Sequence, residues 1–268
     1  MYIKSQEKLC RFIFEEVLMA KIKHVMIALL LAMLLSGCAV ANIFVKTVQG
    51  SGEVVVEKRE VESFSKIKAH GDLELFVTQV EPGVEVHAES NLMKYIHTYV
   101  EDQTLIVEIA DTDGASINLQ PLEPIQVYVM LTKITDLQLS GSVDLKTGQL
   151  IAEDMDMNFS LSGGSTAKIN AVRTGTVDLN LSGASELEIV DGQVSEQFIE
   201  ASGDSRYLAE WVKSESTTMM LSGGSEATIW AEEDFEVDLS GGSIAYYYGS
   251  PNNLNEIKNT GGSDYISK

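Results

Sequence analysis

The stretch "LSGGSTAKI", residues 161–169, returns along the chain with small variations, and its spacing decides the fold. Related nine-residue stretches begin at residues 139, 181, 201, 221, 239 and 259. Their shared glycines recur every 18 to 22 residues: Gly141, Gly163, Gly183, Gly203, Gly223, Gly241 and Gly261. Seven returns at so steady an interval indicate a repeated structural unit of the kind that builds solenoid proteins.

Apolar and polar residues alternate on both sides of each glycine. Phe159 and Leu161 flank Ser160 before one corner, and Ala167 and Ile169 follow it. A period of two indicates strands, and the Leu and Asn framework of leucine-rich repeats is missing. The sequence therefore predicts an all-β fold, a right-handed, single-stranded parallel β-helix with coils of about 20 residues.

Serines flank most glycines of the repeat. We expect the glycine at a corner where a side chain would collide or require an unfavourable φ. We expect stacked serine hydroxyls to bond along the axis and to satisfy backbone groups at the corners. One column precedes the glycine (Ser162, Ser182, Ser202, Ser222, Ser240), and a second follows it (Ser165, Ser185, Ser205, Ser225, Ser243, Ser263).

Residues 52–135 are less regular but also rich in alternating segments, such as "HGDLELFVTQ" and "IQVYVMLT". Turn residues bound each segment, so we interpret them as strands. They form either earlier and longer coils or a sheet that caps the solenoid, because an open end would invite edge-to-edge association.

The first 38 residues have the pattern of an export signal. Lys21 and Lys23 precede an apolar run at 25–35, which is too short to span a membrane. The run ends in "LSGC", which resembles the bacterial lipoprotein signal and implies lipid attachment at Cys38. An ordinary signal peptide or an N-terminal helix is the alternative.

The expected organisation follows from that signal. Residues 1–37 form the signal peptide, 38–51 the anchor and linker, and 52–268 the β-helical domain. Residues 1–18 are interpreted as a start assigned too far upstream, with Met19 as the true start. Ala39 follows the cysteine without an acidic cluster, which by resemblance to sorting patterns indicates the outer membrane of a bacterial envelope.

The composition limits the kinds of partner that we expect. The chain has 19 basic and 40 acidic residues, a net charge of -21. Such a surface repels phosphate backbones, so no nucleic-acid partner is expected. The partners left are the membrane, through the lipid, and a glycan or protein ligand. Cys10 and Cys38 are the only cysteines, so no disulfide is expected in the folded part.

The chain shows no arrangement of residues typical of catalysis. His70, His87 and His97 are scattered, with no zinc-ligand spacing and no nucleophile elbow around any serine. Glu186 and Glu226 share a repeat position with Arg206 and should stack as an ion ladder. We expect no catalytic residue, no metal site and no cofactor.

Two outward aromatic residues are the candidate ligand-binding residues. The register that turns Ile229 and Tyr247 inward turns Trp230 and Tyr246 outward. Exposed rings on a rigid sheet are what sugar rings and protein partners stack against. The alternative is that these rings pack only on neighbouring strands.

The N-terminal segments "VEKREVESFSKIKAHGDLELFVTQ" and "VEVHAESNLMKYIHTYVEDQTLIVEI", followed by the "LSGGS" coils, resemble the bacterial head GIN domain family of autotransporter adhesin heads. The resemblance covers residues 50–268 and marks a lipoprotein-type member. It implies a β-helical envelope protein, non-enzymatic, with an adhesin-like surface. A self-associating envelope scaffold and a carbohydrate-active β-helix enzyme are the alternatives.

Overall fold

The computed structural model describes residues 45–152 and 155–268. The expected signal peptide, Cys38 and most of the linker lie outside the described residues. Residues from Thr47 to Lys268 form one compact unit, which carries the whole described core. Its elements in chain order are β1 (Lys46–Gln49), β2 (Val54–Arg59), β3 (Lys66–Gln79), β4 (Gly83–Glu89), η1 (Met93–Tyr95), β5 (Ile96–Glu101), β6 (Thr104–Ile109), β7 (Ile117–Gln120), β8 (Gln126–Leu131), β9 (Asp136–Ala152), β10 (Met157–Leu161), β11 (Thr166–Leu181), β12 (Glu186–Ile189), β13 (Gly192–Ala201), β14 (Arg206–Leu221), β15 (Glu226–Leu239), β16 (Ile244–Gly249), β17 (Asn253–Asn259) and β18 (Asp264–Ser267).

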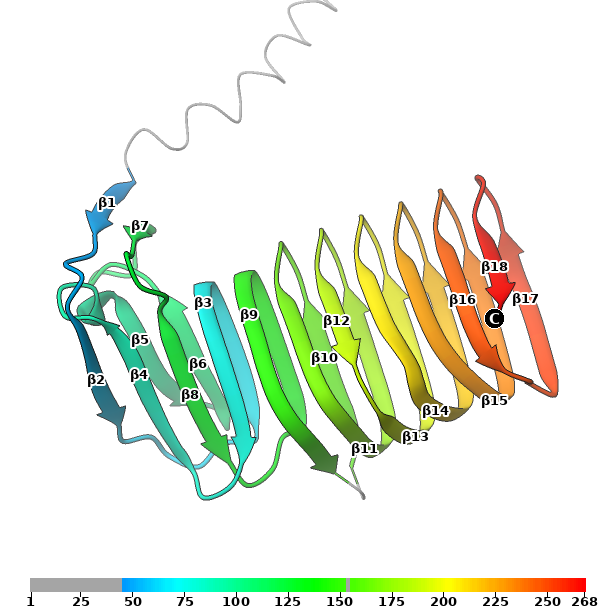
Figure 1. The fold of residues 1–268 in the computed structure, drawn as a ribbon, viewed down its shortest axis with the longest axis horizontal. Helices are drawn as coiled ribbons and strands as arrows, with labels where there is room; N and C mark the ends of the chain where they lie inside the picture. The colour runs from blue at the N-terminus through cyan, green and yellow to red at the C-terminus, as the bar shows by residue number, and fades with distance from the viewer. Residues whose placement is uncertain (1–44, 153–154) are drawn as a thin grey trace, which may run out of the picture. The chain divides into compact units, whose positions relative to one another are not determined.

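From β9 onward every strand pairing is parallel, and each coil stacks on the one before it. We call the segments that follow the corner glycines the front sheet and those that precede them the rear sheet. The chain descends in the front sheet and ascends in the rear sheet while advancing toward the C-terminus, which makes the solenoid right-handed (Figure 1). The predicted parallel β-helix with coils of about 20 residues is confirmed.

The core is made of inward columns that contribute one residue per coil. Leu161 pairs with Leu181, Leu181 with Ala201, and Ala201 with Leu221. All are buried, as the alternation predicts. Each fully buried leucine stabilises the fold by about 1.5–3 kcal/mol, so the stack of coils needs no disulfide.

The corner glycines form a continuous column with φ between +73° and +85°. A Cβ on Gly203 would lie 2.5 Å from the carbonyl oxygen of Gly183. That same oxygen accepts a hydrogen bond from the amide of Asp204 at 2.8 Å, so the coils approach each other closely here. Gly71 pairs with Gly141 and adds an eighth member that the repeat spacing did not reveal.

The second serine column satisfies the corners. Ser185 Oγ lies 3.0 Å from the carbonyl oxygen of Ser182 in its own corner and 3.2 Å from that of Leu161 in the preceding coil. Ser165, Ser225 and Ser243 repeat this arrangement. These hydroxyls are buried and bond to backbone carbonyls, which confirms the expected role of the column.

The N-terminal part combines the two expected arrangements, an earlier coil and a capping sheet. β3 is its first regular coil and pairs in parallel with β9, with β8 in the front sheet and with β6 in the rear sheet. Beyond these the pairing turns antiparallel, with β4 between β8 and β2 and with β5 against β6. Among these antiparallel pairs, β5 and β6 form a hairpin with a two-residue turn, whereas β2–β4 and β4–β8 pair across intervening segments of the chain.

A buried carboxylate fastens this cap. Glu89 at the end of β4 is fully buried, and its Oε2 accepts the amide of Gly52 at 2.7 Å. Its Oε1 accepts the amides of Leu122 and Glu123 at 2.5 and 3.0 Å. These bonds lower the pKa of Glu89, the Gly52 amide having the largest effect, so the side chain stays ionised and joins two distant loops.

Candidate functional site

Trp230 and Tyr246 lie on the front sheet, on the neighbouring strands β15 and β16. Tyr246 pairs with Thr228, and Trp230 pairs with Tyr248, so the two candidate residues are diagonal neighbours. Both are partly exposed, whereas Ile229 and Ala245 beside them are fully buried. The outward direction expected from the alternation is confirmed, and the structure brings the two residues together.

The faces of these rings are covered by neighbouring side chains. Trp230 stacks on Tyr248 with 6.2 Å between ring centroids and an interplanar angle of 11°. The amine of Lys213, on the opposite neighbouring strand, lies 5.5 Å from the Trp230 centroid, and that of Lys268 lies 4.2 Å from the Tyr246 centroid. A ligand therefore meets ring edges and two ammonium groups before it meets an open ring face.

Trp211 is the most exposed aromatic residue in the described part of the chain, at 60%. Alternation from Tyr207 and Ala209 would turn Trp211 inward, so the sequence pattern did not indicate it as a candidate. An irregularity in β14 between Leu208 and Lys213 changes the parity and turns Trp211 outward, two residues before Lys213. We call Trp211, Trp230, Tyr246 and Tyr248 the aromatic patch.

The charges around the aromatic patch differ from those of the whole chain. Lys213 and Lys268 lie against its rings, and the amine of Lys213 forms an ion pair with Glu232 at 3.7 Å. Aromatic CH and ring surfaces together with amine donors suit the apolar faces and hydroxyl or carboxylate groups of sugars, and also acidic protein segments.

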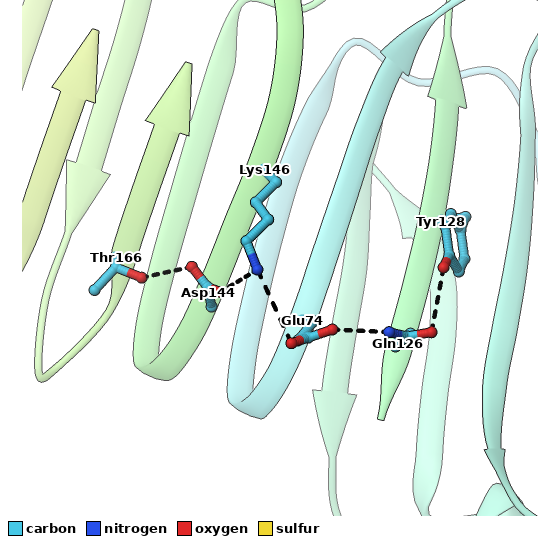
Figure 2. A network of polar contacts seen from close by, with 6 residues as sticks. All are labelled: Glu74, Gln126, Tyr128, Asp144, Lys146 and Thr166. Carbon is cyan, nitrogen blue, oxygen red and sulfur yellow. Dashed lines mark hydrogen bonds and ion pairs between the residues drawn. The ribbon is translucent and has the colours of Figure 1, made fainter. Parts of the chain in front are cut away.

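A second polar cluster lies on the front sheet at the cap (Figure 2). Lys146 Nζ lies 2.8 Å from an oxygen of Asp144 and 4.0 Å from one of Glu74. Asp144 accepts the hydroxyl of Thr166 at 2.7 Å, and Glu74 accepts the amide of Gln126 at 2.8 Å. A groove of about 400 Å³ borders the two carboxylates.

This cluster has the residue types that a carbohydrate-active enzyme would require, and its charged groups are paired with one another. Burial raises the pKa of Asp144, and the hydrogen bonds from Lys146 and Thr166 outweigh it and leave that pKa lowered. The hydrogen bond to Asp144 raises the pKa of Lys146. At neutral pH the carboxylate of Asp144 is therefore ionised and the amine of Lys146 is protonated, and the two form an ion pair.

The histidines hold neighbouring strands. His87 Nε2 lies 2.6 Å from Glu85, and the His87 ring packs on Tyr128. His70 hydrogen-bonds to Ser140, and His97 to the carbonyl oxygen of Ala110. His70 lies between Ser140 and Glu108 of the two neighbouring strands, and the Glu108 carboxylate accepts a hydrogen bond from the hydroxyl of Tyr99.

One step of the expected ion ladder has formed in the front sheet, between Arg206 and Glu186. Glu186 pairs with Arg206 and Arg206 with Glu226, as their shared repeat position predicts. Arg206 Nη1 lies 3.1 Å from Glu186, and Lys168 lies 2.6 Å from Glu188 one column away. These exposed pairs are each worth a few tenths of a kcal/mol and bind coil to coil.

The rear sheet carries a shallow groove of about 370 Å³ over five successive coils. It is polar, lined by Asn180, Glu200, Asp238 and Lys258, with the exposed Met220 at its centre. Within residues 45–152 and 155–268, no group of three or more histidine, cysteine or acidic side chains could hold a metal ion. The same residues include no helix long and apolar enough to cross a membrane.

The comparisons with known proteins agree with this fold. The family model described as "Putative auto-transporter adhesin, head GIN domain" matches residues 63–251, more than two thirds of the chain. The chain belongs to the head GIN domain family. The family description names an adhesin rather than an enzyme, and adhesins act at the cell surface or in the envelope.

Solved structures share the fold at low sequence identity. A "putative adhesin" from Bacteroides fragilis has a TM-score of 0.74 at 16% identity, and the match covers 82% of this chain and 100% of that one. A "putative lipid binding protein" from Parabacteroides distasonis has a TM-score of 0.66 at 15% identity, with 82% and 100% covered. A "putative adhesin" from Parabacteroides merdae has 0.64 at 17%, with 82% and 99% covered. No curated protein matches the sequence.

Proposed function

We propose that this head GIN domain protein is a non-enzymatic, lipid-anchored envelope protein whose aromatic patch binds a glycan or protein ligand. The observation that carries the proposal is the aromatic patch, four outward aromatic residues held by successive coils around Trp230. Strands β14 and β15 pair with a neighbouring strand on both sides, which holds them rigid. Little of the protein therefore has to become ordered when a ligand binds, so the entropic cost of binding is small. The adhesin description of the family supports the same function.

The anchor belongs to this proposal. The "LSGC" motif supports attachment of lipid at Cys38, and Ala39 supports delivery to the outer membrane. More than one acyl chain gives stable anchoring, whereas a single chain gives only marginal binding.

The test is a binding screen of residues 45–268 against glycans and host matrix proteins, with and without calcium. We expect a saturable ligand whose affinity falls at least about tenfold in Trp211→Ala and Trp230→Ala, since exposed aromatics dominate such contacts. Phe198→Ala is the matched control, because Phe198 is 43% exposed but lies on the rear sheet. Its affinity should equal that of the wild type.

Two outcomes contradict the proposal. One is a folded protein that binds nothing across the panel, which favours an envelope scaffold. The other is a ligand that Phe198→Ala weakens and the two tryptophan variants do not, which moves the binding surface to the rear sheet.

A further inference from the structure

The last coil of the solenoid leaves two strand edges unpaired. Among the described residues, β17 pairs only with β15, and β18 pairs only with β16. We call these two strands the C-terminal edge (Figure 1). An edge strand presents free N–H and C=O groups that can pair with another strand.

The C-terminal edge also exposes apolar side chains, and one of them, Leu254, continues a column that earlier coils bury. Leu254 pairs with Phe235, which is 1% exposed, yet Leu254 itself is 39% exposed because no further coil covers it. Ile257 on β17 and Ile266 on β18 are 56% and 38% exposed. The open end of the core is thus apolar as well as unpaired, which marks an interaction surface.

Charge on the C-terminal edge is balanced, unlike that of the whole chain. Between residues 253 and 268 the acids Glu256 and Asp264 are matched by Lys258 and Lys268, against a net charge of -21 for the full sequence. A second copy of so acidic a chain is repelled over most of the surface. It meets least repulsion at this edge.

The order of these charges is self-complementary. On β18, Asp264 and Lys268 each lie two residues from Ile266 and on the same outer face, since side chains alternate. A two-fold axis through Ile266 pairs β18 antiparallel with its own copy. It sets Asp264 opposite the partner's Lys268 and Ile266 opposite the partner's Ile266. Opposite charges in such pairs stabilise, and like charges destabilise.

The same axis meets the rear sheet at Ile257. The corner between β17 and β18 is centred on Gly261 and Gly262, and Ile257 and Ile266 lie equally far from it along the chain. β17 is irregular at this point, because its register with β15 shifts between Glu256 and Lys258, and the Glu256 carboxylate accepts a hydrogen bond from Tyr265. The self-complementary charges therefore lie on β18. We propose that a second copy of this chain covers the C-terminal edge, in a tail-to-tail dimer with β18 antiparallel to its copy.

Sedimentation equilibrium of residues 45–268 tests this proposal. This unit holds the described core, and its match with a solved structure covers the whole chain of that structure. We therefore expect the unit to fold alone. We expect a monomer–dimer equilibrium between about 1 μM and about 1 mM, weakened at least about tenfold by Ile257→Lys or Ile266→Lys. Val56→Lys is the matched control, since Val56 is 55% exposed on β2 at the opposite end.

A charge exchange tests the register. Asp264→Lys and Lys268→Asp should each weaken the dimer, and the double variant should restore it, because a two-fold axis recreates both pairs with reversed sign. A protein that stays monomeric at about 1 mM overturns the proposal. So do oligomers larger than dimers that Val56→Lys weakens, since these would be head-to-tail stacks. Circular dichroism confirms that each variant is folded. Ligand binding by the aromatic patch is measured separately, so either proposal can fail alone.

Discussion

Single glycines decide how closely the coils approach. The corner column needs residues that accept a positive φ and also lack a Cβ, because the carbonyl of the preceding glycine occupies that space. Asparagine and aspartate tolerate the first requirement but fail the second. Glycine therefore recurs here through seven coils with no exchange, while the residue that follows it varies.

Gly203→Ala should destabilise the protein by about 2 kcal/mol or more, from the unfavourable φ and the contact with Gly183. Urea unfolding measures the loss. Gly175→Ala is the control, since a Cβ there meets nothing within 4 Å and its φ is not positive. Its stability should change by less than about 1 kcal/mol. Equal losses in the two variants would show that the corner is not constrained.

At the scale of strands, regular elements could be predicted from the sequence and irregular ones could not. Period-two alternation placed Trp230 and Tyr246 outward, because one residue per position per coil keeps the parity fixed. Trp211 could not be placed, since the irregularity after Leu208 shifts the parity and leaves no sign in residue type. Gly71 was missed because 70 residues of cap separate it from Gly141 along the chain.

The cap shows the same limit. Its strands could be predicted, but antiparallel and parallel pairing need the same alternating residues, so the two expected arrangements could not be separated. The buried, ionised state of Glu89 could not be predicted either. Its hydrogen-bond partners are the backbone amides of Gly52, Leu122 and Glu123, and backbone contacts leave no pattern in the side chains.

Glu89→Gln should weaken the cap in a pH-dependent way. The folded protein holds the pKa of Glu89 below its ordinary value of 4.5. The carboxylate therefore stabilises the fold above that pH, and the contribution is lost as the pH falls below it. We expect a lower urea midpoint for the variant at pH 7, with the difference from wild type shrinking between about pH 5 and about pH 3.

Glu123→Gln is the control for this prediction, because Glu123 lies in the same loop with an exposed side chain. Its midpoint should follow that of the wild type throughout. If the urea midpoints of Glu89→Gln and the wild type differ by the same amount at every pH, the carboxylate acts through its shape and not its charge.

The whole molecule is close to one-dimensional, since each coil contacts mainly its neighbours. Removal of one whole coil should therefore keep the fold. Deletion of residues 164–183 joins Gly163 to Ala184 and preserves every column, because the removed length is the 20-residue interval between two corner glycines. We expect a β-rich, cooperatively unfolding protein with a reduced urea m-value, since less surface is buried.

Deletion of residues 164–173 is the contrasting variant. It removes half a coil and sets front-sheet residues against rear-sheet ones, so we expect an aggregated or unfolded product by circular dichroism and light scattering. Survival of the half-coil deletion would contradict a register fixed by the corners.

The glycine column has a mechanical consequence. Its hydrogen bonds, such as that from the amide of Asp204 to Gly183, point from coil to coil along the axis. A pull along the axis opens one interface at a time and fails at the weakest. A pull along the strands must shear all the bonds of an interface together. The molecule should thus resist force far better across its length than along it, and a tethered copy would hold best when drawn sideways.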